Sequence, residues 1–199
     1  MMYAPDASSD AVGHRLDFTK KLIGTIAPVR QREALQRWLE VAEKGRVTRK
    51  ELTPAMFGRT LQFVVLVDVL DGGKDYRHVI EGREVIRWFG KAGDTPFSAL
   101  YAPQHFAQLK SFYLTVLMTG RPNVRHFMVH SLRDEELAYS QLVLPAVNEE
   151  GVVTRLAVVF DFPDPFRRIP DGPLRMFSTW WQMQKGGASE TILGDHNWR

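Results

Sequence analysis

Acidic, histidine and tyrosine side chains are the groups of this sequence whose types and spacing could carry chemistry. Asp68 and His78 fall on two strands that the pattern predicts to be neighbours, so they could form an acid–base pair in a cavity. Such a pair works only if the two side chains lie within about 3 Å of each other. It would make the chain a small-molecule enzyme of the cone-shaped α+β type, which stays open as the alternative function.

One pair of histidines, His126 and His130, raises a metal hypothesis. The two residues are four positions apart on a predicted strand. This spacing places them on one face but about 13 Å apart, too far to share one ion. We therefore expect no metal site and read both as polar sheet positions.

Polar side chains also occur at alternate positions of two predicted strands. Tyr76 and His78 lie on one strand, and Tyr139 and Gln141 lie on another. If they point inward, they give a small pocket its hydrogen-bonding groups. If they point outward, they are surface or interface positions, and we favour the outward orientation.

Helical residues complete the set of ligand-pocket candidates. Trp88 lies in a short helical turn, His105 lies one turn into a long helix, and Tyr113 lies on the apolar stripe of that long helix. Helices of this kind pack on a sheet through their apolar side. His105 could approach a cavity there, or face solvent near the start of the helix.

The absence of cysteine removes several classes of chemistry. Disulfides, thiolate zinc sites, iron–sulfur clusters, c-type haem and flavin bound as a cysteinyl adduct are excluded. Non-covalent flavin stays open. The sequence also has no nucleophile elbow, no phosphate-binding glycine loop and no zinc-protease motif. Nothing positive supports catalysis, so we expect a protein that is not an enzyme.

The net charge of +3 is unevenly distributed, because residues 14–50 hold ten Lys and Arg against four acidic residues. A basic stretch can bind nucleic acid, but this one lacks interleaved aromatic residues and a known binding motif. We favour a solvated helix face. No apolar run approaches the roughly 20 residues of a membrane span, and the start of the chain does not resemble an export signal. We therefore expect a cytoplasmic protein.

Hydrophobic spacing and Gly/Pro punctuation predict the elements that position these residues. An amphipathic helix begins near Pro28, a hairpin covers 61–81, a short helix covers 85–89 and a long helix covers 103–119. Strands are predicted at 123–132, 137–145 and 152–162, and a further helix at 174–184.

This order predicts an α+β fold: a five-stranded antiparallel sheet with its helices on one face. The domain covers 28–162. Residues 1–27 form a disordered or short helical arm before it, and residues 163–199 form a C-terminal extension.

Several short motifs in this order resemble the stand-alone bacterial PAS proteins of the PAS_5 type. The helix containing Trp38 ends at Gly45-Arg46, and a Leu-Thr-Pro at 52–54 precedes the first strand. Other matching motifs are Leu66-Val67-Asp68-Val69, Tyr76-Arg77, Phe89-Gly90, Thr119-Gly120-Arg121-Pro122 and Leu142-Val143-Leu144-Pro145. The resemblance spans roughly residues 33–162.

The resemblance implies a role in signal transduction, as a sensor or a protein–protein interaction module, with an unidentified signalling protein as partner. It also implies a homodimer through the N-terminal helix, at Leu35, Trp38 and Leu39. Trp180 and Trp181 are further interface candidates, because aromatic residues outside a core often mark docking surfaces. Haem-binding PAS domains use a helix histidine, but we disfavour b-type haem here. Whether a small ligand is bound, and which one, stays open.

Overall fold

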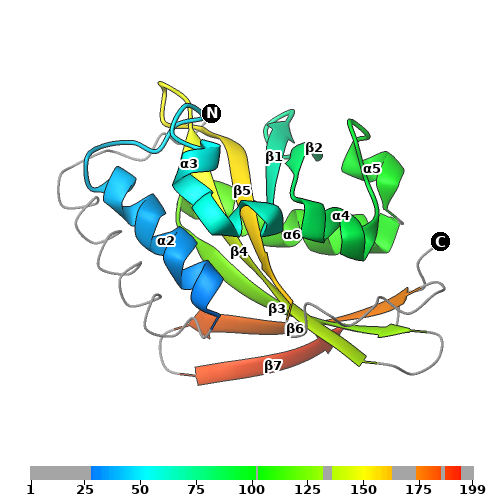
Figure 1. Cartoon of the computed structure of the whole chain (residues 1–199). Coiled ribbons are helices and arrows are strands. Elements are labelled where there is room, and N and C mark those ends of the chain that lie inside the picture. The colour runs from blue at the N-terminus through cyan, green and yellow to red at the C-terminus, as the bar shows by residue number, and fades with distance from the viewer. Residues whose placement is uncertain (1–27, 102, 132–135, 163–173, 185–186, 194–199) are drawn as a thin grey trace.

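The structure is a computed structural model that describes residues 28–101, 103–131, 136–162, 174–184 and 187–193 (Figure 1). The expected arm at 1–27 lies outside these residues, as does most of the expected extension. The helices are α2 (Val29–Ala42), α3 (Pro54–Phe57), the 3-10 helix η1 (Gly58–Phe63), α4 (Arg83–Phe89), α5 (Phe97–Leu100) and α6 (Pro103–Thr119). The strands are β1 (Val64–Leu70), β2 (Asp75–Glu81), β3 (Asn123–Ser131), β4 (Glu136–Val147), β5 (Val153–Asp161), β6 (Leu174–Gln184) and β7 (Gly187–Leu193).

The predicted five-stranded antiparallel sheet is confirmed, and its strands lie in the order β2-β1-β5-β4-β3. The hairpin turn between β1 and β2 depends on glycine. Gly73 has a φ of 92°, and a Cβ there would lie 2.7 Å from Leu117 Cδ2 of α6. The turn therefore packs closely on the long helix, and both the positive φ and the limited space favour glycine there.

One strand start and one element type differ from the prediction. The first strand begins at Val64, because Gly58–Phe63 forms the helix η1. Residues 174–184 form the strand β6 instead of the predicted helix, and β6 pairs with β3 from Ser131↔Leu174 to Met128↔Phe177. The pairing satisfies backbone groups along β3 that an edge strand would leave open. Together with β7, it extends the sheet to seven strands.

The sheet has helices on both faces, whereas the sequence predicted them on one (Figure 1). The inner face, as we call it, carries Val65, Val67 and Val158 and packs against α4, α5 and α6. The outer face carries Val64, Leu66 and similar alternate residues and packs against α2 and α3. The three helices between β2 and β3 thus share one face as predicted, and the N-terminal helix covers the opposite face.

Helix α2 places the expected dimer residues against the chain's own sheet. Leu35, Trp38 and Leu39 are all buried in the outer-face core. The indole Nε1 of Trp38 donates a hydrogen bond to the Pro145 carbonyl at 3.0 Å. Burial of each such side chain contributes about 1.5–3 kcal/mol. A dimer formed through these three residues would require α2 to leave the sheet.

A buried polar contact fixes the position of α2 further. Gln31 Nε2 donates to the Val159 carbonyl at 2.9 Å, and the Ser140 hydroxyl donates to Gln31 Oε1 at 3.2 Å. Both groups of the Gln31 amide are therefore satisfied by neighbouring sheet residues. Helix α2 is an integral layer of the domain.

Candidate ligand-binding site

The inner face collects most of the polar side chains that the sequence singled out. Tyr76, Tyr113, Tyr139 and Gln141 are all buried there. The outward orientation that we favoured is therefore wrong for the strand residues Tyr76, Tyr139 and Gln141. The sequence was ambiguous because helices cover both faces of the central strands, so alternation along β4 does not separate core from solvent.

One group of aromatic rings joins strand β2 to helices α5 and α6. The Tyr76 ring lies 5.1 Å from the Tyr113 ring in an edge-to-face arrangement, and 5.9 Å from the Phe97 ring. Phe97 in turn contacts the His78 ring at 4.9 Å. These contacts explain why Tyr76 points inward: its ring fills the space between two helices.

A second group of rings holds Trp88 of α4 and Tyr139 of β4. Trp88 stacks on Phe162 at 4.7 Å, and Phe162 lies 6.0 Å from Tyr139. Tyr139 also stacks on Phe127 of β3 at 5.0 Å. The structure thus places Tyr76, His78, Trp88, Tyr113, Tyr139 and Gln141 in one layer between sheet and helices. The side chain of His105 lies outside the described part of the structure.

Three of these side chains end in buried polar atoms that lack a hydrogen-bond partner within the described part of the chain. The atoms are the hydroxyl of Tyr76, Nε1 of Trp88 and Oε1 of Gln141. A buried polar group without a partner costs about 1–3 kcal/mol. Such groups call for an explanation, and a bound molecule that supplies the missing partners is one.

The tyrosines act here as neutral hydrogen-bonding groups. Burial raises the pKa of Tyr76, Tyr113 and Tyr139 above the ordinary value, because the low-dielectric interior disfavours the phenolate. The neighbouring hydroxyls raise the pKa of Tyr113 further, and Arg125 opposes them. Each phenol keeps its proton and can donate or accept a hydrogen bond.

Arg125 of β3 is a buried cation in this layer that the sequence analysis missed. Its guanidinium lies 5.4 Å from the Phe112 ring centroid and 5.2 Å from that of Phe127, and donates to the Gln108 carbonyl at 3.4 Å. Desolvation lowers its pKa to about 10, so it stays charged at pH 7. The strand register could have indicated its orientation. Arg125 lies two residues before the inward-facing Phe127 and pairs with Gln141 across the sheet, so it points to the same face.

Glu81 is a second missed residue, and it ties His78 to the loop after α4. Its carboxylate lies 3.1 Å from Nδ1 of His78, and accepts hydrogen bonds from the backbone N–H groups of Ala92 at 2.9 Å and Gly93 at 3.0 Å. Burial raises the pKa of Glu81, but these hydrogen bonds outweigh it and bring the pKa below its usual value. Burial lowers the pKa of His78, and Glu81 partly opposes that effect.

A β-bulge explains why His78 and Glu81 can meet. Residues three apart on a regular strand point to opposite faces. The register of β2 shifts between Leu66↔Ile80 and Val67↔His78, so that Val79 is the extra residue. Beyond the bulge the alternation is reversed, and His78 and Glu81 share the inner face.

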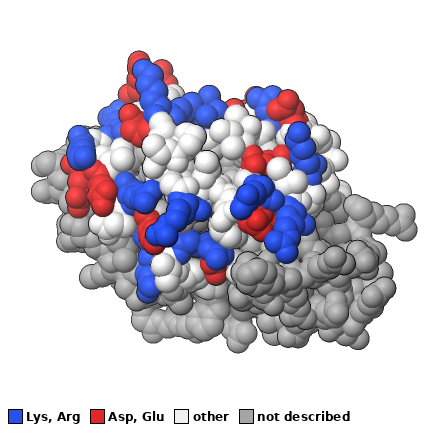
Figure 2. All heavy atoms as spheres, in the orientation of Figure 1, with Lys and Arg blue, Asp and Glu red and all other residues white. Residues whose placement is uncertain are grey.

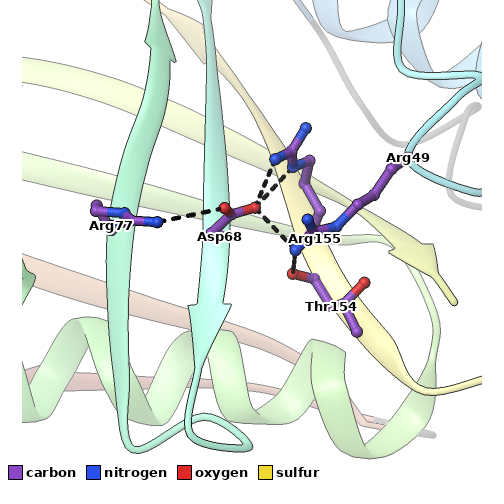
Figure 3. A network of polar contacts seen from close by, with 5 residues as sticks. All are labelled: Arg49, Asp68, Arg77, Thr154 and Arg155. Carbon is purple, nitrogen blue, oxygen red and sulfur yellow. Dashed lines mark hydrogen bonds and ion pairs between the residues drawn. The ribbon is translucent and has the colours of Figure 1, made fainter. Parts of the chain in front are cut away.

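The proposed pair of Asp68 and His78 is not formed, because the two residues lie on opposite faces of the sheet. Asp68 lies on the outer face among Arg49, Arg77 and Arg155 (Figure 3). His78 lies on the inner face against Phe97. The enzyme hypothesis thereby loses the acid–base pair that supported it best.

Several arginines of the basic N-terminal stretch form ion pairs or hydrogen bonds with other parts of the chain. Arg30 forms an ion pair with Asp161 at 2.9 Å, Arg37 donates to the Met56 carbonyl at 3.1 Å, and Arg46 donates to the Glu149 carbonyl at 2.8 Å. Figure 2 shows Lys and Arg interspersed with Asp and Glu on the face in view. This arrangement favours a structural role over a nucleic-acid surface.

The remaining expectations concern metals, membranes and the C-terminal tryptophans. Within the described residues, no group of three or more His, Asp or Glu side chains could hold a metal ion, and no helix is long and apolar enough to cross a membrane. Trp180 and Trp181 lie on β6, and their side chains are outside the described part.

In comparisons with protein-family models, curated proteins and solved structures, the chain gives no match in any of the three.

Proposed function

We propose that this chain is a PAS-type regulatory module that senses a small molecule and acts on another protein by contact. The observation that carries the proposal is the set of buried, unpartnered polar atoms of Tyr76, Trp88 and Gln141 on the inner face. The order of the five strands and the helices between β2 and β3 supports it, because both are expected of a PAS-like domain.

The unpartnered atoms define what the ligand must offer. Trp88 Nε1 only donates and Gln141 Oε1 only accepts, whereas the Tyr76 hydroxyl does either. The surroundings are otherwise aromatic and aliphatic. The ligand is therefore a largely apolar molecule that carries at least one hydrogen-bond acceptor, and a donor if it reaches Gln141.

The proposal also covers how the signal leaves the domain. A homodimer and an unidentified signalling protein remain the proposed partners, in the cytoplasm. Since Leu35, Trp38 and Leu39 are covered by the sheet, contact surfaces other than this stripe are the ones to test first.

Native mass spectrometry of the freshly purified chain, compared with its denatured mass, tests the proposal. We expect extra mass per protomer, and the same spectrum counts the subunits. A thermal-shift screen of small apolar compounds covers ligands lost in purification. The variants Trp88→Phe and Gln141→Met should weaken binding. Thr60→Val is the control, because its hydroxyl is buried but satisfied by the Phe57 carbonyl at 2.6 Å.

Failure to find extra mass, together with a flat screen, would refute ligand sensing. Binding that survives both inner-face variants unchanged would place the ligand elsewhere and remove the observation that carries the proposal.

A further inference from the structure

A cluster of three arginines around one carboxylate lies on the outer face, away from the candidate ligand layer. We call Arg49, Arg77, Arg155 and Asp68 the arginine cluster (Figure 3). The three guanidinium groups come from the loop after α2, from β2 and from β5, and Asp68 of β1 lies between them. Three positive charges face one negative charge, so the cluster holds a surplus of two positive charges.

Two of the arginines are already held in position. Arg155 approaches Asp68 Oδ1 through both Nε and a terminal nitrogen, each at 2.8 Å. Arg49 lies 3.1 Å from the same oxygen and also donates to the Thr154 carbonyl at 3.2 Å. An anion that binds here does not have to order these long side chains, which removes part of the usual entropic cost.

The third arginine and the exposed ends of the cluster leave room for more interactions. Asp68 and Arg155 form a floor with side chains only 12% and 17% exposed, whereas Arg49 and Arg77 are 47% and 41% exposed on opposite sides of it. Arg77 lies 3.9 Å from Asp68 Oδ2, beyond hydrogen-bond distance. Among the described residues, Asp68 is the only acidic side chain that forms an ion pair with any of the three.

We infer that the arginine cluster is a binding site for a phosphate group, bridged between Arg49 and Arg77 above the Asp68–Arg155 floor. Guanidinium forks match the geometry of phosphate oxygens. A phosphate monoester carries a charge of about −1.5 to −2 at pH 7, which balances the surplus of the cluster. A single carboxylate would leave about half of that surplus uncompensated.

The site is independent of the proposed sensing function. Asp68 pairs across the sheet with outward residues Arg77 and Arg155, whereas the ligand layer lies on the inner face. Either site can therefore be present without the other, and the variants below leave the inner face intact.

Isothermal titration of the full chain tests the inference, with inorganic phosphate as the probe and with chloride at equal ionic strength as the reference. Arg77→Ala is the main variant, because among the described residues its side chain makes only the 3.9 Å ion pair with Asp68 and donates no hydrogen bond. It should weaken phosphate affinity by about fivefold or more, as removal of one charge near 5 Å from a screened dianion requires. Arg87→Ala is the matched control: its side chain is 48% exposed and pairs with Glu84 at 3.1 Å.

Asp68→Asn provides a test of opposite sign. It raises the surplus from two to three positive charges, and should tighten phosphate binding by about fivefold. A short phosphoserine peptide, run beside its unphosphorylated form, separates the sources. Tighter binding than inorganic phosphate identifies a phosphorylated protein as the ligand, whereas equal or weaker binding identifies a free phosphate compound.

Two results would overturn the inference. One is a heat signal with phosphate no larger than that with chloride. The other is equal weakening by Arg77→Ala and Arg87→Ala, since that would reduce the effect to the overall charge of the chain.

Discussion

The hydroxyl of Tyr76 offers the sharpest test of the inner-face site. The Tyr76 ring is fully buried and contacts Tyr113 and Phe97, and its oxygen has no partner among the described residues. Tyr76→Phe removes only that oxygen and keeps the ring contacts. Because an unsatisfied buried hydroxyl costs about 1–3 kcal/mol, the ligand-free variant should be more stable by about 1 kcal/mol.

The measurements are urea unfolding and thermal unfolding of the ligand-free protein, both followed by circular dichroism. A gain of 1 kcal/mol corresponds to a rise in Tm of about 2–4 °C for a chain of this size. The comparison is Thr60→Val, which removes a buried hydroxyl that donates to the Phe57 carbonyl at 2.6 Å. That variant should lose about 1 kcal/mol, so the two substitutions should have opposite signs.

The outcome that refutes the reasoning is a loss in Tyr76→Phe as large as that in Thr60→Val. It would mean that the Tyr76 hydroxyl is hydrogen-bonded in the ligand-free protein, for example to an internal water. When a ligand that hydrogen-bonds to the Tyr76 oxygen is saturating, Tyr76→Phe should no longer be more stable than the wild type. The wild-type hydroxyl then has its hydrogen-bond partner.

The remaining predictions concern Glu81, which accepts hydrogen bonds from the loop between α4 and α5, and Trp38 of helix α2 on the outer face. Glu81→Gln should cost about 2 kcal/mol in urea unfolding at pH 7, since a charged acceptor of two backbone hydrogen bonds is replaced by a neutral one. The pKa of Glu81 is lowered in the folded state, so its contribution is present above its ordinary pKa and is lost as pH falls through the folded value. Stability of the wild type should thus decline below about pH 4.5, and the variant should decline less; parallel curves would contradict this role. Trp38→Ala should lower the unfolding free energy by about 3–5 kcal/mol, whatever the oligomeric state, because the indole is buried in the chain's own core. A stable Trp38→Ala monomer formed from a wild-type dimer would instead restore the interface hypothesis.

The sequence predicted the sheet well because each strand has its own local signals. Short-range preferences determine three of these features: the β1–β2 turn, the long helix that ends before Gly120, and the alternating strands of the C-terminal half. The strand β6 was predicted as a helix, since its aromatic and polar residues fit either period. Pairing with β3 decides the outcome, and a partner strand more than 40 residues away leaves no local signal.

The candidate site was predictable in composition but not in orientation. The sequence identified Tyr76, Tyr139 and Gln141 but assigned them to the wrong face. It did not predict that helix α2 packs on the outer face of the sheet. Glu81 joins His78 only through a bulge that reverses the alternation of β2. Arg125 was passed over because charged residues are rarely buried, so its inward register received no weight.

Because helix α2 covers the outer face, strand β4 has packed side chains on both of its faces, and adjacent residues belong to different layers. Gln141 faces the candidate ligand layer, whereas its neighbour Ser140 faces the other way and donates to Gln31 of α2. A backbone shift that brought Gln141 toward a ligand would also displace Ser140, because one planar peptide unit joins the two residues. The same shift would lengthen or shorten the bond to Gln31. Occupancy on one side would therefore be transmitted as strain on the other, without a channel or hinge between them.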